Sequence, residues 1–289
     1  MAISAKAVSE LRKQTSAGMM ACKKALTETN GDLEAAAKLL REKGEAKRSD
    51  RADRETSEGI VATHVAADAN SGILAVVNCE TDFVAKNDAF QAWVGEVLEA
   101  VANSGAASAE EALAVSFGSE GGTVENALGA KFAELGEVIK ISRLARFEVS
   151  GNGSIASYIH MGGKVGVLLE VGCENADTAS NDEFSTLLKD ITLHIAAASP
   201  AGLTRDDIDG TVVEEENEIN RKQLLADGKP EAIIDKILIG KINKFYSEQV
   251  LTEQAFVKDP DLSIAKLLEA KGKDLGDTLT IRRYERFGI

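Results

Sequence analysis

The residues best suited to chemistry in this 289-residue chain are its few cysteines and histidines. They are Cys22, Cys79, Cys173, His64, His160 and His194. No CxxC pair, HExxH motif, GxxxxGK[ST] phosphate loop or GxSxG nucleophile motif occurs among them or elsewhere. Three widely spaced cysteines also argue against a disulfide framework or a zinc site and fit a reducing, cytoplasmic compartment. We therefore expect no metal, no cofactor and no enzymatic activity.

Cys79 defines the main alternative, an enzyme that uses this thiol as a nucleophile. It follows the apolar run "GILAVVN", which predicts a buried β-strand. A cysteine at the end of a buried strand is most often a small apolar filler, because burial keeps a thiol protonated and inert. The position of Cys79 therefore favours a structural role.

Composition limits the kinds of partner. The chain has 33 basic and 47 acidic residues, a net charge of −14, and 44% hydrophobic residues. The hydrophobic content is enough for two compact domains. The negative charge opposes binding to nucleic-acid phosphates or to an anionic membrane, and no apolar run is long enough to span a bilayer. A protein or a small molecule is the expected partner.

The chain contains an internal duplication. "GILAVVNCETDFVAKNDAF", residues 72–90, aligns without a gap on "GVLLEVGCENADTASNDEF", 94 positions later. "IKISRLARF", residues 139–147, aligns on "LTIRRYERF", 140 positions later. The pairs Cys79/Cys173 and Phe90/Phe184 recur, so these residues are expected to serve the fold.

Each copy is predicted to form an antiparallel strand pair, an Asn-Asp helix cap, helices and a closing strand. The caps are Asn87-Asp88 and Asn181-Asp182. The change of offset from 94 to 140 places about 46 additional residues in the second copy, and helical periodicity around the turn "ADGKP" predicts a helical hairpin at about residues 208–250. The predicted fold class is α+β, with core subdomains at 58–150 and 151–289.

The first 45 residues are predicted to form three short helices with little core. The first is capped by Ser4, and the third begins after Asp32 and ends at Gly44. Such a minimal bundle is more typical of an accessory binding module than of a catalytic domain. Residues 46–57 are highly charged and are expected to form a solvated linker or helix.

The two copies differ between their shared anchors, "TDFVAK" in the first and "NADTAS" in the second. If Phe83 and Val84 were needed to close the core, the second copy would keep large apolar residues there. It has Asp177 and Thr178 instead. We therefore expect Thr81 to Lys86 to form a loop that exposes Phe83 and Val84 as binding anchors. In the alternative, Phe83 packs locally against its own helix.

Several segments together resemble the elongation factor Ts family of bacterial guanine-nucleotide exchange factors. They are "ELRKQTSAGMMACKKAL", "VNCETDFVAKNDAF", "SYIHMGGKVGVLLEV" and "HIAAASP". The resemblance extends over essentially the whole chain. It implies a ubiquitin-associated-like three-helix domain at 1–45, a core of two related α/β subdomains, and a coiled-coil hairpin inserted in the second. It also implies a protein that binds elongation factor Tu-GDP, displaces magnesium and promotes GDP release so that GTP can bind.

The resemblance assigns roles to individual residues. Displacement of the partner's magnesium is associated with Thr81, Asp82, Phe83 and Val84. Further contacts with the partner are implied for Leu11, Arg12, Met19, Met20, Lys23 and His160. A structural or ubiquitin-like-binding adaptor is a third hypothesis, but it rests only on the N-terminal helices and leaves the duplication unexplained. The residues leave open whether the inserted hairpin contacts the partner or dimerises the protein, giving a homodimer or a 2:2 complex.

Overall fold

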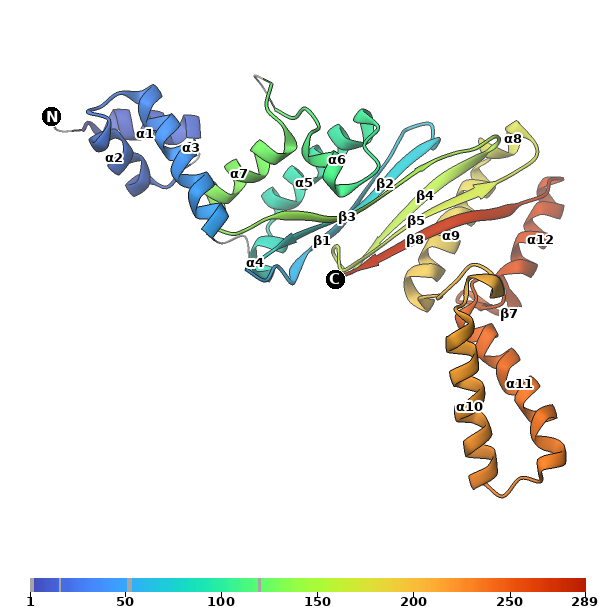
Figure 1. The fold of residues 1–289 in the computed structure, drawn as a ribbon. Helices are drawn as coiled ribbons and strands as arrows, with labels where there is room; N and C mark the ends of the chain where they lie inside the picture. Colours follow the sequence, from blue (N-terminus) through green and yellow to red (C-terminus); the bar gives the residue numbers. More distant parts are fainter. Residues whose placement is uncertain (1–2, 16, 51–53, 119–120) are drawn as a thin grey trace.

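Three helices form an N-terminal domain at one end of the molecule (Figure 1). The computed structural model describes residues 3–15, 17–50, 54–118 and 121–289. The helices of this domain are α1 Ala5–Thr15, α2 Met19–Glu28 and α3 Leu33–Asp50. Their small core is made of apolar side chains from all three helices, including Leu11, Cys22, Leu26 and Ala36.

Short polar residues start two of these helices, as predicted. The Ser4 hydroxyl accepts a hydrogen bond from the Ala7 amide (3.1 Å), and the Asp32 carboxylate accepts one from the Ala35 amide (3.0 Å). Each bond satisfies a backbone donor that has no partner within the helix.

The predicted end of the third helix is wrong, because α3 continues through Gly44 to Asp50. A glycine inside a helix costs about 1 kcal/mol relative to alanine, and the Glu, Ala, Lys and Arg residues that follow are good helix formers. The charged segment predicted at 46–57 is therefore helical at its start. Its residues 51–53 lie outside the described residues.

The core contains two copies of one arrangement, confirming the predicted α+β class. The first copy comprises β1 Glu58–Val65, β2 Ser71–Cys79, α4 Asp82–Ala85, α5 Asp88–Ser104, α6 Ala109–Leu113, α7 Val124–Leu135 and β3 Lys140–Glu148. The second comprises β4 Gly153–His160, β5 Val165–Gly172, α8 Ala176–Ala179, α9 Asp182–Ala198, α12 Ile264–Leu275 and β8 Thr280–Gly288. The antiparallel sheets have the orders β1-β2-β3 and β4-β5-β8. Even the register shift of the central strand is repeated, at Val76/Val77 and at Glu170/Val171.

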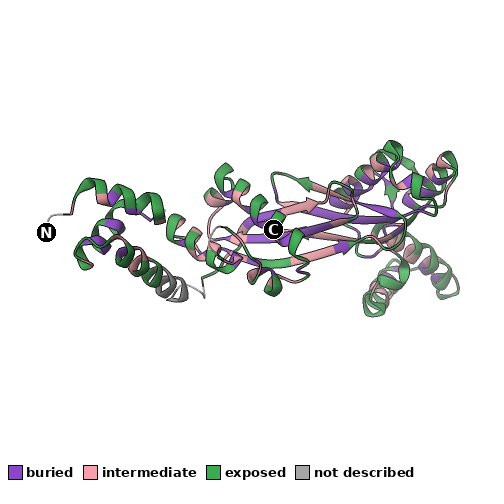
Figure 2. Ribbon diagram, turned by 90° about the horizontal axis from the view of Figure 1, so that it is seen from above, coloured by how far each residue is buried: buried purple, intermediate pink, exposed green. Residues whose placement is uncertain are grey.

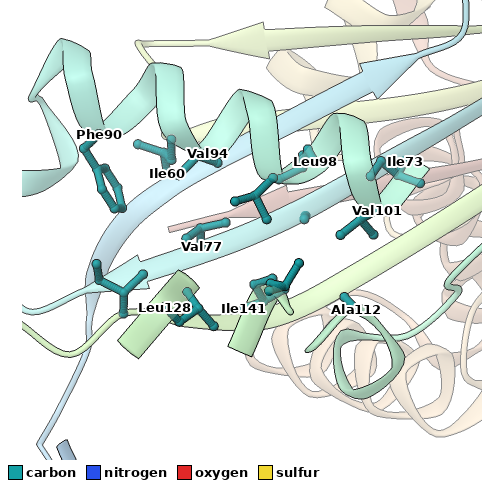
Figure 3. Packing of buried hydrophobic residues seen from close by; sticks show 14 of the residues in the cluster. Ile60, Ile73, Val77, Phe90, Val94, Leu98, Val101, Ala112, Leu128 and Ile141 are labelled. Carbon is teal, nitrogen blue, oxygen red and sulfur yellow. The ribbon is translucent and has the colours of Figure 1, made fainter. Parts of the chain in front are cut away.

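Each central strand is buried on both faces, which explains its largely apolar sequence. The exception in β5 is the buried Glu170, which pairs with Arg282 and Arg283. In β2, Ile73 and Val77 face the helices α5, α6 and α7, where they meet Phe90 and Leu98 of α5 (Figure 3). The intervening Leu74 and Val76 belong instead to a cluster between the two sheets. The layers are therefore helices, sheet, sheet and helices, and buried residues follow the central strands (Figure 2).

The two sheets meet around an approximate two-fold axis. Thr63 and Ser157, which are 94 positions apart, lie with their hydroxyl oxygens 3.1 Å from each other. Backbone hydrogen bonds are exchanged in the same way. The Val61 amide donates to the Gly163 carbonyl (2.7 Å), and the Ile155 amide, 94 positions later, donates to the Ala69 carbonyl (2.8 Å). The copies thus form a self-complementary interface of the kind seen in two-fold dimers.

The predicted Asn-Asp caps and aromatic anchors are confirmed. Asn87 accepts a hydrogen bond from the Phe90 amide, and Asn181 accepts one from the Glu183 amide. Phe90 and Phe184 are both fully buried beneath their helices.

The second copy carries an insertion between α9 and α12. Its elements are a short 3-10 helix Arg205–Asp207, α10 Gly210–Ala226, α11 Glu231–Gln249, β6 Ala255–Phe256 and β7 Asp259–Ser263. The helices α10 and α11 form the predicted hairpin, which projects from the core (Figure 1) and packs around Leu224, Ile234 and Leu238. The small β6–β7 sheet was too short to predict from periodicity. Among the described residues, no helix has the length and hydropathy of a membrane span.

Candidate protein-binding site

The segment predicted to be a loop, Thr81 to Lys86, is a one-turn helix, α4. Thr81 caps it, because its hydroxyl accepts a hydrogen bond from the Val84 amide (3.4 Å). The carboxylate of Glu137, also in the first copy, holds Thr81 in turn: it accepts hydrogen bonds from the Thr81 amide (3.0 Å) and from the Thr81 hydroxyl (2.6 Å). This short helix is therefore anchored at its N-terminus by the rest of the subdomain.

Phe83 and Val84 point in different directions. The Phe83 residue is 83% exposed, so the prediction of an outward-facing aromatic is confirmed and local packing is not its role. Val84 is half-buried and packs against the core of the first subdomain, so its predicted exposure is wrong. The second copy explains the difference: Asp177 is exposed at the position of Phe83, and Thr178 is buried at the position of Val84.

A shallow pocket of about 170 Å³ joins α4 to the turn between β4 and β5. Its lining includes Asp82 and Lys86 from α4 and Met161 and Lys164 from the turn. The turn approaches closely because Gly163 has a left-handed φ of 96°, and a Cβ at this position would lie 3.1 Å from the Ile60 Cβ. A larger residue would push the turn away from β1 and so away from α4.

The charged groups around this pocket are paired at the surface. Lys86 Nζ lies 2.7 Å from the Asp82 carboxylate, and this hydrogen bond lowers the pKa of Asp82 and raises the pKa of Lys86. Lys164 Nζ lies 2.7 Å from the Glu58 carboxylate. Exposed pairs of this kind add little to stability and can rearrange at low cost when a partner binds.

Met161 is absent from the residues that the sequence predicts, although 72% of it is exposed on the same surface. The signal was available: its counterpart 94 positions earlier is Ala67. The exposed apolar side chains at and beside this pocket therefore come from both copies: Met161 lines it, and Phe83 follows the lining residue Asp82.

His160, at the end of β4, is exposed beside Met161. Its Nδ1 lies 3.1 Å from the Tyr158 hydroxyl oxygen, and the two rings stack with centroids 5.8 Å apart. His160 is therefore an available surface residue of fixed orientation, next to the turn that lines the pocket.

The remaining predicted residues lie on α1 and α2 of the N-terminal domain. Four are exposed: Arg12, Met19, Met20 and Lys23. Both methionines protrude, with 59% and 75% exposure. Leu11 is fully buried in the core of the three helices, so its side chain offers no contact surface and the implied role does not fit this structure. The structure thus groups the predicted residues into two surfaces, one on each domain.

The two core cysteines are structural in both copies. Cys79 is fully buried and its thiol donates to the Thr81 carbonyl (3.1 Å), as Cys173 does to the Asn175 carbonyl (3.3 Å). Burial raises the pKa of Cys79 to about 11, so the thiol is protonated at neutral pH and is a poor nucleophile. Within the described ranges, no cluster of three histidine, cysteine or acidic side chains is arranged to hold a metal ion.

The fold and the site define a protein that acts by binding another protein. A duplicated scaffold presents an aromatic side chain on an anchored helix, and its buried thiols are unsuited to catalysis. A family model described as Elongation factor TS matches residues 80–289. Proteins named Elongation factor Ts are 46% identical over 288 residues in Trichlorobacter lovleyi and 48% identical over 285 residues in Clostridium perfringens, covering 99% of this chain and 92% of each relative.

The chain belongs to the elongation factor Ts family, the guanine-nucleotide exchange factors of elongation factor Tu. The resemblance inferred from the sequence is thereby confirmed.

Proposed function

We propose that Phe83 is the wedge with which this protein opens the nucleotide site of elongation factor Tu, displacing magnesium and releasing GDP. An exchange factor must bind the magnesium-depleted or nucleotide-free partner more tightly than the loaded one. By linkage, it then weakens nucleotide binding by the same factor. The observation that carries this proposal is the exposure of Phe83 on an anchored helix, at a position where the second copy has Asp177.

The other residues of α4 have supporting roles in this proposal. Thr81 caps the helix, and Val84 attaches it to the core. Asp82 is paired with Lys86 in the free protein, and the loss of that exposed pair on binding would free the carboxylate to orient or hydrogen-bond groups of the partner near its magnesium site.

Two further surfaces extend the contact. His160 and Met161 continue the surface around Phe83, whereas the N-terminal domain offers a separate surface. The latter consists of Arg12, Met19, Met20 and Lys23. Exposed methionines suit such a contact, because their flexible side chains adapt to the surface they meet.

The inserted hairpin leaves several apolar side chains exposed: Val212, Ile219, Leu225, Ile233 and Ile239. We propose that they are covered by a second copy of the chain in the cytoplasm, giving a homodimer or a 2:2 complex with the partner. Sedimentation of the free protein tests this, since a hairpin that contacts only the partner leaves a monomer.

The exchange proposal is tested by the release of labelled GDP from elongation factor Tu. Wild-type protein should accelerate release. Phe83→Asp, which copies the residue of the second subdomain, should abolish most of the acceleration, and Asp177→Ala should not change it. A wild-type protein that leaves release unchanged contradicts the function, and a fully active Phe83→Asp contradicts the wedge.

A further inference from the structure

Glu137, in the segment between α7 and β3, holds Thr81, the residue that caps α4. Its two carboxylate oxygens accept separate bonds from Thr81, one from the amide (3.0 Å) and one from the hydroxyl (2.6 Å). That hydroxyl in turn accepts from the Val84 amide, beside Phe83 in sequence. A continuous chain of hydrogen bonds thus leads from Glu137 to the backbone that carries the exposed aromatic.

The second copy has a matching carboxylate. Asp277, 140 positions after Glu137, accepts bonds from the amides of Glu174 (2.9 Å) and Asn175 (3.0 Å), and Asn175 is the counterpart of Thr81. The clamp therefore belongs to the duplicated scaffold. The copies differ in the donors: Glu137 accepts from the amide and the hydroxyl of Thr81, whereas Asp277 accepts from two amides. In addition, the Thr81 side chain caps α4, whereas Asn175 makes no side-chain cap on α8.

We infer that Glu137 is a positioning residue for nucleotide exchange, which holds α4 so that Phe83 is presented in its binding orientation. This inference rests on the proposed function of Phe83. A helix of one turn is unstable by itself, because its nucleation fixes several residues for few hydrogen bonds. Without the clamp, the partner would have to order α4 on binding, and that cost would be subtracted from the affinity.

The two carboxylates provide a matched pair of variants. Glu137→Ala and Asp277→Ala remove the same kind of clamp from each copy, so both should lower the free energy of unfolding. Hydrogen bonding from the Thr178 side chain and the amides lowers the pKa of Asp277 to about 2, so the control clamp is well bonded. Only Glu137→Ala should slow GDP release from elongation factor Tu, by about tenfold in kcat/KM. Glu137→Gln, which keeps the size and one acceptor oxygen, should retain part of the rate and covers the case in which Glu137→Ala fails to fold.

A double-mutant cycle separates positioning from general stability. In a Phe83→Ala background, Glu137→Ala should have no further effect on exchange, while its effect on unfolding persists. Full activity of folded Glu137→Ala and Glu137→Gln overturns the inference, as does a tenfold loss that remains undiminished in the Phe83→Ala background. An equal loss of exchange in Asp277→Ala also overturns it. If Phe83→Ala itself exchanges at the wild-type rate, the proposed wedge fails together with the positioning role, and this result is distinct from the others.

Discussion

Truncation of Phe83 to alanine should separate partner binding from folding. The side chain is 83% exposed, so its removal leaves no cavity and should change the free energy of unfolding by less than about 0.5 kcal/mol. In a complex that buries it, roughly 150 Å² would leave water, worth about 4 kcal/mol gross at ~25 cal/mol/Å². The cost of ordering the Phe83 side chain, together with the contacts that its neighbours keep after truncation, reduces the expected loss of binding free energy to about 2–3 kcal/mol. This corresponds to a decrease in kcat/KM of about 30- to 150-fold.

The assay is stopped-flow release of fluorescent GDP from elongation factor Tu over a range of exchange-factor concentrations. Urea unfolding of each variant is measured in parallel. Phe83→Leu serves as a graded control, because it keeps much of the apolar area and should recover part of the rate. Asp177→Ala, at the equivalent exposed position of the second copy, should behave as wild type.

Two results would refute this reasoning. A decrease of less than threefold with unchanged stability means that Phe83 remains exposed in the complex. A loss of exchange matched by an equal loss in the free energy of unfolding means that the aromatic ring supports the fold instead of the contact.

Three further outcomes are expected. Met161→Ala should lower kcat/KM by about three- to tenfold without affecting urea unfolding, whereas Ala67→Gly, at its counterpart, should leave exchange unchanged. His194 is buried and hydrogen-bonded to Gln254, and burial lowers its pKa. As the pH falls, His194 is therefore protonated in the unfolded chain before it is protonated in the folded protein. The free energy of unfolding should decrease below pH ~6.5, and His194→Asn should show a smaller decrease. Cys79→Ser should retain exchange within about twofold, because a hydroxyl can replace the thiol as donor to the Thr81 carbonyl, and iodoacetamide should leave native wild-type protein active.

Much of the fold was predictable because the sequence carries two versions of it. The apolar run of β2 and the matching, largely apolar segment of β5 predicted buried strands, and the Asn87 and Asn181 caps fixed the helix starts that follow them. The end of α3 was not predictable from Gly44, since the helix-forming residues beyond it outweigh one glycine. A single residue such as Gly44 contributes a known cost to the free energy of helix formation, but the end of a helix depends on the summed helix propensities of the residues around it.

The candidate site was only half predictable. The comparison of copies correctly identified Phe83 as dispensable to the core, but it treated Val84 in the same way. Thr178 shows why this failed: a threonine can be buried as well as a valine, so a polar residue in one copy does not prove exposure in the other. Met161 joins the surface only through the packing of β4 on β1, a contact between copies that periodicity within one strand does not reveal.

The approximate two-fold symmetry of the core explains how a single binding surface arises from a duplicated scaffold. A symmetric pair of subdomains would present two equivalent surfaces, each formed by a short helix of one copy and a hairpin turn of the other. Phe83 and Met161 make one of them apolar, and Asp177 and Ala67 leave the other without large apolar side chains. Because both short helices lie on the same duplicated scaffold, exchanging these residue pairs between the copies should move the apolar surface without changing the fold. A doubly exchanged protein that keeps wild-type stability but loses exchange would show that the asymmetry lies in these side chains, whereas retained exchange would place the binding determinant elsewhere.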